Sequence, residues 1–314
     1  MRVTVIGGGG AVGATVAYTL AIDRPALDVQ ICDVDGDAAW GHATDARHAR
    51  LHASHPVGPD VSATGDVTTI DPGPEAVRGA DYVVVTASVP RPEGGAERGG
   101  REAFWPGNRD LADEIAEWLR DAEPCPVVVV TNPADRMVSR LHDRSGWPCE
   151  RFLGYSLSET ARIADAIGRR ADADPATVDC PILGEHGEHI VPAFSRATVD
   201  GELLDLDATA REEILEYVRS VPYDVMDRRG RRDSSRWVTG RGASLVVESM
   251  LDGGTDDPIC LATPLDGAYG IDGVAVSVPV VLSATGVDRV VEWELADDER
   301  AALEAAARAV REAI

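Results

Sequence analysis

The feature that most constrains this chain is a glycine-rich turn at its start. A short apolar segment, residues 2–6, runs into four glycines at positions 7–10, and a helical pattern begins around position 13. A strand, a tight glycine turn and a helix start are typical of a dinucleotide-binding loop, because glycines allow a sharp turn, close approach to a pyrophosphate and close helix packing. The helix N-terminus then offers N–H groups to the phosphates. The predicted cofactor-binding residues of this turn are Gly7, Gly8, Gly10, Val12 and Gly13.

A carboxylate after the next predicted strand narrows the choice of cofactor. The apolar segment 29–32 ends at Asp33, 20 residues after Gly13. A carboxylate at this position accepts hydrogen bonds from the adenosine ribose hydroxyls and repels a 2′-phosphate. Glycines alone are also compatible with a flexible loop, so the position of Asp33 is what favours NAD over NADP.

The length and the cysteine content limit the kinds of protein that this chain can be. The 314 residues suffice for two lobes with a substantial core. No apolar stretch has the length of a membrane span, and the chain opens on a strand pattern rather than a signal peptide. The five cysteines are scattered, odd in number and without a C-x-x-C pair, which favours reduced thiols in the cytoplasm over a disulfide framework or a zinc site.

The charge balance is strongly acidic. The formal net charge is −24, from 30 basic and 54 acidic residues, and every basic residue is arginine. Acidity spread along the whole chain indicates a surface adapted to high salt, where repulsion is screened, and hence a salt-loving host. Its sign disfavours binding to nucleic acid. A basic stretch at residues 228–232 is compatible with an anion site, but its pattern favours a solvated loop or a subunit contact.

Strand and helix patterns alternate through the first half. Residues 82–86 and 127–130 are continuous apolar runs, typical of parallel strands buried on both faces. The pattern becomes mixed near residues 140–150. The fold class predicted is therefore α/β, with an N-terminal doubly wound parallel sheet of the Rossmann type over residues 1–143 and a C-terminal α+β substrate domain over residues 144–314.

Further elements and two possible sites follow from the pattern. A helix over residues 41–55 carries four histidines, but no carboxylate or cysteine set completes a metal site, and none is predicted. Residues 87–101 are rich in glycine and arginine and follow a strand, which suits a mobile lid that carries cations to an anionic substrate, the alternative being a plain solvated loop. We also expect a helix over residues 158–168 capped by Ser158, and a half-exposed strand over residues 274–282.

A histidine between glycines completes a set of motifs. His186 follows a predicted strand in Gly184-Glu185-His186-Gly187, where its ring can face a cleft and titrate near neutrality. Together with residues 7–13, Asp33, 41–48, 86–91 and 131–133, this stretch resembles the lactate/malate dehydrogenase family over nearly the whole chain. The resemblance implies an NAD-dependent 2-hydroxy acid dehydrogenase of the type found in the tricarboxylic acid cycle. It also implies a homo-oligomer, dimer or tetramer, with helix 41–55 at a contact.

The resemblance implies a role for each matching residue. His186 matches the histidine that exchanges the substrate's hydroxyl proton while hydride moves to or from nicotinamide. Arg162 matches the arginine that grips the substrate carboxylate as a planar fork, and Arg101 the lid arginine that polarises the carbonyl. Asn132 matches an asparagine that contacts substrate beside the nicotinamide, and Asn108 a position near the cofactor.

Two further matches bear on the substrate and on departures from the family. Arg91 matches a position where malate enzymes carry arginine and lactate enzymes usually glutamine, which favours a dicarboxylate, malate or oxaloacetate, because a second buried carboxylate needs a second cation. Glu159 stands where the family usually has the aspartate that orients the histidine. The lid is several residues longer than usual, so Arg98 rivals Arg101, and a larger 2-oxo acid is an alternative substrate. An alternative of another class is a non-catalytic dinucleotide-binding paralogue.

Overall fold

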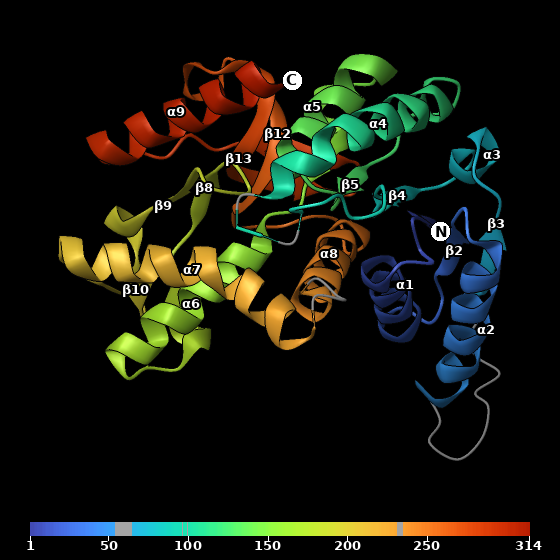
Figure 1. The fold of residues 1–314 in the computed structure, drawn as a ribbon, viewed down its shortest axis with the longest axis horizontal. Helices are drawn as coiled ribbons and strands as arrows, with labels where there is room; N and C mark the ends of the chain where they lie inside the picture. Colours follow the sequence, from blue (N-terminus) through green and yellow to red (C-terminus); the bar gives the residue numbers. More distant parts are fainter. Residues whose placement is uncertain (54–64, 96, 99, 231–234) are drawn as a thin grey trace.

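The computed structural model describes residues 1–53, 65–95, 97–98, 100–230 and 235–314. Within those ranges one large sheet runs through both halves of the chain, in the order β3-β2-β1-β4-β5-β6-β12-β13-β8-β9, with β14 beside β13. Figure 1 shows the first half at one end of the molecule and helices α6, α7 and α9 at the other. The end of the predicted helix 41–55 and residues 231 and 232 of the basic stretch lie outside the described residues.

The first half builds a parallel sheet with helices on both faces. Its elements are β1 (Arg2–Ile6), α1 (Ala11–Asp23), β2 (Asp28–Cys32), α2 (Gly36–Ala53), β3 (Val67–Ile70), α3 (Pro74–Val77), β4 (Tyr82–Val85), α4 (Trp105–Arg120), β5 (Val127–Val129), α5 (Ala134–Ser145) and β6 (Phe152–Gly154). Strands β1 to β6 pair in parallel in the order 3-2-1-4-5-6, the doubly wound arrangement of dinucleotide-binding domains. The predicted fold class is confirmed.

The strands of this half are apolar because both of their faces are covered. Val84 and Val128 pack with α1 and α2 on one face, whereas Val83 and Val127 pack with α4 and α5 on the other. Each of these four side chains is completely buried. Side chains alternate across a strand, so a continuous apolar run fits only a sheet that is covered on both sides.

The second half is mixed. Its elements are α6 (Leu157–Ala171), β7 (Val178–Asp179), β8 (Ile182–Gly184), β9 (Ile190–Pro192), β10 (Thr198–Val199), β11 (Glu202–Leu203), α7 (Ala208–Arg228), α8 (Arg236–Leu251), β12 (Ile259–Asp266), β13 (Asp272–Ser283), β14 (Gly286–Val290) and α9 (Asp297–Ala313). The predicted boundary at residues 143 and 144 falls within α5, and the parallel pairing continues through β6 to Gly154. No helix in the described part of the chain is long and apolar enough to span a membrane.

Two local expectations were wrong. The strand at residues 274–282 is buried along its length rather than half-exposed, because both of its faces are covered. Ala275 packs in the cluster that contains α5 residues, and Val276 packs in the cluster that contains residues of α8 and α9. Ser158 does not cap α6: the cap position is Ser156, and the Ser158 hydroxyl instead bonds to the Tyr155 hydroxyl at 3.0 Å. A helix pattern fixes its start only to within a residue or two.

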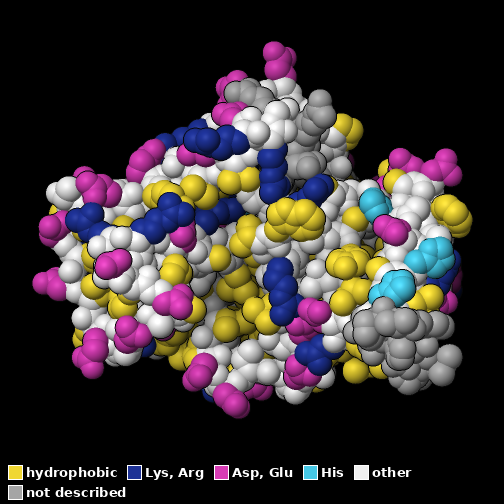
Figure 2. Space-filling model, turned by 90° about the horizontal axis from the view of Figure 1, so that it is seen from below, with side chains coloured by type: hydrophobic (Ala, Val, Ile, Leu, Met, Phe, Trp, Pro, Cys, Tyr) yellow, Lys and Arg dark blue, Asp and Glu magenta, His cyan; other side chains and the backbone are white. Residues whose placement is uncertain are grey.

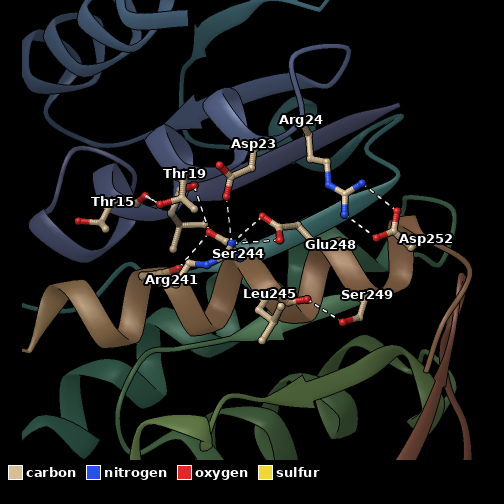
Figure 3. A network of polar contacts seen from close by, with 12 residues as sticks. Thr15, Thr19, Asp23, Arg24, Arg241, Ser244, Leu245, Glu248, Ser249 and Asp252 are labelled. Atoms are coloured by element: carbon tan, nitrogen blue, oxygen red, sulfur yellow. Dashed lines mark hydrogen bonds and ion pairs between the residues drawn. The ribbon is translucent and has the colours of Figure 1, made fainter. Parts of the chain in front are cut away.

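Helix α8 joins the two halves. It comes from the second half of the chain but packs against α1 of the first (Figure 1). Figure 3 shows the charged groups along this contact: Arg241 lies 3.1 Å from Asp23 and 2.9 Å from Glu248, and Arg24 donates to Asp252 at 2.8 Å. Helix α1, which begins at the glycine turn, is therefore held at its C-terminal end against an element of the second half.

Candidate active site

The glycine turn and Asp33 form one rigid corner at the carboxyl end of β1 and β2. The N–H groups of Gly7 and Gly8 donate to the Cys32 carbonyl at 2.8 and 3.2 Å, and that of Gly9 donates to Asp33 Oδ2 at 2.8 Å. Gly7 has a φ of +87°, and a Cβ on Gly13 would lie 2.3 Å from the Gly7 carbonyl oxygen, so neither position accepts a side chain. The N-terminus of α1 thus opens beside a fixed carboxylate.

An open cleft of about 200 Å³ lies between the two halves. Six of the predicted site residues line it and come from five separate segments of the chain, because two of them share the lid segment. They are Val12, Arg91, Arg101, Asn132, Arg162 and His186. The cleft continues past Val12 at the start of α1, so it reaches from the glycine turn to the histidine. Acidic side chains are scattered over the surface that Figure 2 shows rather than gathered in one patch, which makes three arginines in one cleft a local exception to the charge of the protein.

His186 and Glu159 meet in the wall of this cleft. His186 Nδ1 lies 2.7 Å from Glu159 Oε2, and the two side chains are 8% and 4% exposed. The distance is that of a hydrogen bond but the alignment is poor, and both the charge of His186 and hydrogen bonding from it act on the carboxylate. The other carboxylate oxygen, Oε1, accepts from Arg162 Nη1 at 3.3 Å. One glutamate on α6 therefore holds both the histidine and the buried arginine.

The charge on Glu159 depends on these neighbours. Burial alone would raise the pKa of its carboxyl, but the positive groups of His186, Arg162 and Arg101 outweigh burial and lower the pKa to about 2. Burial also lowers the pKa of the Arg162 guanidinium, against the opposing effect of Glu159. The Glu159 carboxyl is therefore ionised at neutral pH where it faces the His186 imidazole.

The two candidate lid arginines lie in different surroundings. Arg98 forms a two-pronged ion pair with Glu216 on α7, at 2.7 and 2.9 Å, and does not line the cleft. Arg101 lines the cleft and donates from Nη1 to the His186 carbonyl at 3.0 Å. Arg91, which is exposed, lines the cleft at the other side of the lid. Of the two rivals, Arg101 is the one beside the histidine.

The two asparagines differ in how they are used. Asn108 on α4 is completely buried: its amide donates to the Asn132 carbonyl at 2.7 Å and its oxygen accepts from the Val89 N–H at 2.8 Å. It therefore ties the loop after β4 to the loop after β5. Asn132 lines the cleft, and its Oδ1 is buried with no hydrogen-bond partner among the described residues. A buried oxygen that lies beside a cleft and has no partner can accept a hydrogen bond from a donor group of a ligand.

Several residues of this site were not predicted from the sequence. Tyr223 and Met226 at the end of α7, and Ser235 and Thr239 at the start of α8, also line the cleft, but nothing local in their sequence marks them. Asp135 is the second omission: it lies three residues after Asn132 and touches His186. Within the described ranges, no three His, Cys, Asp or Glu side chains are grouped to hold a metal ion.

Comparisons with known proteins agree with this arrangement. A sequence profile of the lactate/malate dehydrogenase NAD binding domain matches residues 1–154, and one of the lactate/malate dehydrogenase alpha/beta C-terminal domain matches residues 159–314. Malate dehydrogenase of Halobacterium salinarum is 33% identical over 310 residues, which cover 98% of this chain and 96% of the relative. L-lactate dehydrogenase of Salinibacter ruber is 30% identical over 321 residues, with coverage of 99% and 96%. The structure of malate dehydrogenase from Salinibacter ruber matches with a TM-score of 0.85 and 28% identity, over 100% of this chain and 96% of that one.

Proposed function

The chain belongs to the lactate/malate dehydrogenase family of NAD-dependent 2-hydroxy acid dehydrogenases, and on this basis we propose that it interconverts (S)-malate and oxaloacetate. The observation that carries the proposal is the cleft that gathers Arg91, Arg101 and Arg162 around His186. A dicarboxylate with a reacting carbonyl offers one group to each of these three cations, and a charged carboxylate matches the planar fork of an arginine.

NAD is the cofactor, and when bound it supplies the hydride acceptor or donor. The corner formed by Gly7, Gly13 and Asp33 suits its two ends: the opening of α1 for the pyrophosphate and the Asp33 carboxylate for the ribose hydroxyls. Val12 continues this surface into the cleft. Asn108 acts on the cofactor side through Asn132, whose loop it holds.

His186 exchanges the proton in this proposal. In reduction its imidazolium gives a proton to the carbonyl oxygen of oxaloacetate, and in oxidation the neutral ring takes the hydroxyl proton of malate. Glu159 stabilises the imidazolium through its contact at 2.7 Å with Nδ1. Arg162 holds the carboxylate next to the reacting carbon, Arg101 polarises the carbonyl, and Arg91 binds the distal carboxylate.

The test is a comparison of oxaloacetate, pyruvate and branched 2-oxo acids with NADH in high salt. We expect oxaloacetate to have the highest kcat/KM, and Arg91→Gln to lower it by about 10²-fold or more because a carboxylate would lose its charged partner. Pyruvate should lose little in the same variant, which serves as the internal control. A higher kcat/KM for pyruvate or a branched acid in the unmodified protein would contradict the malate assignment.

Two alternatives have specific support. The long lid and the glutamate at position 159 favour a dehydrogenase for lactate or a larger 2-oxo acid, with the same histidine chemistry. A non-catalytic dinucleotide-binding paralogue predicts NADH binding without turnover of any 2-oxo acid and no effect of His186→Asn. The substrate comparison separates all three.

The setting of the enzyme is also part of the proposal. Exposed Trp40 on α2, and Tyr18, Trp237 and Leu245 on α1 and α8, favour a homo-oligomer that buries this side, either dimer or tetramer. The net charge of −24 without lysine favours function in high salt. All five cysteines are free thiols, in keeping with the cytoplasm. Light scattering at several salt concentrations tests both the oligomeric state and its dependence on high salt.

A further inference from the structure

The backbone of His186 makes a hydrogen bond through its N–H group and another through its carbonyl. Its N–H donates to Asp135 Oδ2 at 2.8 Å, and its carbonyl accepts from Arg101 Nη1 at 3.0 Å. These bonds are separate from the contact between the imidazole ring and Glu159. The backbone of the histidine is thus fixed by a carboxylate of the first half of the chain, whereas its ring is fixed by a carboxylate of the second half.

Asp135 sits on a rigid support, and His186 does not. Asp135 is the second residue of α5, and its carbonyl accepts from the Ser139 hydroxyl at 2.8 Å, which in turn accepts from the Ala275 N–H of β13 at 2.8 Å. His186 lies in the turn between β8 and β9, which begins at Gly184 with a φ of +88°. The hydrogen bond between Asp135 and the His186 N–H therefore ties the turn to helix α5, which is itself bonded to strand β13.

The surroundings of Asp135 are costly for a carboxylate. The residue is 1% exposed, and its Oδ1 has no hydrogen-bond partner in the described part of the chain. Burial, and then the nearby Glu185, raise the pKa of its carboxyl to about 8, although the His186 N–H opposes this. A leucine of similar size would avoid this cost, so the bond to His186 is the feature that distinguishes a carboxyl here.

We propose that Asp135 is a positioning residue that fixes the His186 peptide and thereby aims the imidazole into the cleft. This rests on the proposed function, in which His186 exchanges the proton with the substrate. Displacement of a reacting group by about 1 Å can lower a rate about 10²-fold. Asp135 acts through His186 and does not line the cleft itself.

The test compares Asp135→Ala, Asp135→Asn and a matched control, Ser145→Ala. Asparagine keeps an oxygen that accepts from the His186 N–H and resembles the protonated carboxyl. Ser145 is also on α5 and buried, and its hydroxyl also accepts a backbone N–H, that of Trp147 at 3.3 Å, at the far end of the helix. We expect kcat to fall about 10- to 100-fold in Asp135→Ala with the KM for NADH unchanged, and to stay within about threefold of the unmodified enzyme in Asp135→Asn and Ser145→Ala.

Hydrogen exchange of the His186 amide tests the role of Asp135 independently of enzymatic activity. We expect the amide of His186 to exchange at least about tenfold faster in Asp135→Ala, and near its original rate in Asp135→Asn, whether or not oxaloacetate proves to be the substrate. If Asp135→Ala does not fold, Asp135→Asn decides: loss of kcat or of His186 protection in that folded variant overturns the proposal. Unchanged kcat in a folded Asp135→Ala overturns it as well. Absence of turnover of any 2-oxo acid by the unmodified protein would instead contradict the proposed function, and exchange would still test the role of Asp135.

Discussion

The two ends of the cleft are built on different principles. At the cofactor end, the glycine turn and Asp33 lie within 33 residues and make their contacts mostly through backbone N–H groups. At the histidine end, the side chains come from four separate segments: Glu159 and Arg162 from α6, and His186, Arg101 and Asn132 from three others. A site made by the backbone of one short segment tolerates few substitutions that change its shape. A site assembled from side chains of distant segments depends on the charges near each side chain and on the contacts that hold it in place.

The largest expected effect is the loss of His186. His186→Asn should lower kcat by about 10²- to 10⁴-fold, because the amide cannot exchange the proton, and should leave the affinity for NADH unchanged. Stopped-flow and fluorescence titration measure the two quantities. His189→Asn, a change at an exposed histidine of the same turn, is the control and should be nearly silent. An equal loss in both variants would mean that the turn, and not the proton exchange, was damaged.

The next effect concerns the charge behind the histidine. The pKa of Glu159 is lowered to about 2, from an ordinary value of 4.5, so its charge contributes stability above about pH 4.5 that is lost as pH falls toward 2. Glu159→Gln should therefore cost about 3 kcal/mol at pH 7, and the difference from the unmodified protein should shrink in acid. Urea unfolding at several pH values measures it.

Glu159→Asp serves as the companion variant because it retains the charge on a shorter side chain. We expect it to keep most of the stability but to lose part of kcat, since the contact with His186 would lengthen. Equal stability losses for Glu159→Gln and Glu159→Asp would show that size rather than charge matters at this position.

At the cofactor end, two glycines should separate stability from binding. A Cβ on Gly13 would meet the Gly7 carbonyl oxygen at 2.3 Å, so Gly13→Ala should destabilise the protein by about 1–3 kcal/mol even without cofactor. A Cβ on Gly10 meets that oxygen only at 3.4 Å, so Gly10→Ala should leave thermal unfolding unchanged and weaken NADH binding. Thermal unfolding with and without NADH measures both. Matching behaviour of the two variants would contradict the division of roles within the turn.

The smallest effect is expected at the outer part of the lid. Arg98→Gln removes the exposed ion pair with Glu216 and should change the KM for oxaloacetate by less than about threefold, with the difference vanishing in high salt. Arg101→Gln, at the arginine beside His186, should lower kcat much more and at every salt concentration. A larger loss in Arg98→Gln would reverse the assignment of the lid arginine.

The same contrast explains what the sequence could predict. The glycine turn, Asp33 and the buried strands were predictable because each depends on neighbours in sequence and on the periodicity of a strand. Family resemblance added His186, Arg162 and Arg101. Asp135 and Thr239 were not predicted. The Asp135 carboxyl accepts a hydrogen bond from a residue 51 positions away, and Thr239 lines a cleft formed by distant segments, so no local sequence pattern indicates either contact.

The contact between α1 and α8 has a consequence for exchanging parts between relatives. Residues 1–154 match one domain profile and residues 159–314 another, which invites a chimera joined between them. Asp23 and Arg24 of the first part, however, are matched to Arg241 and Asp252 of the second. A hybrid whose α8 came from another enzyme would set unmatched charges against the helix that begins at the glycine turn, so compatibility of the two halves depends on this helix pair as well as on the junction.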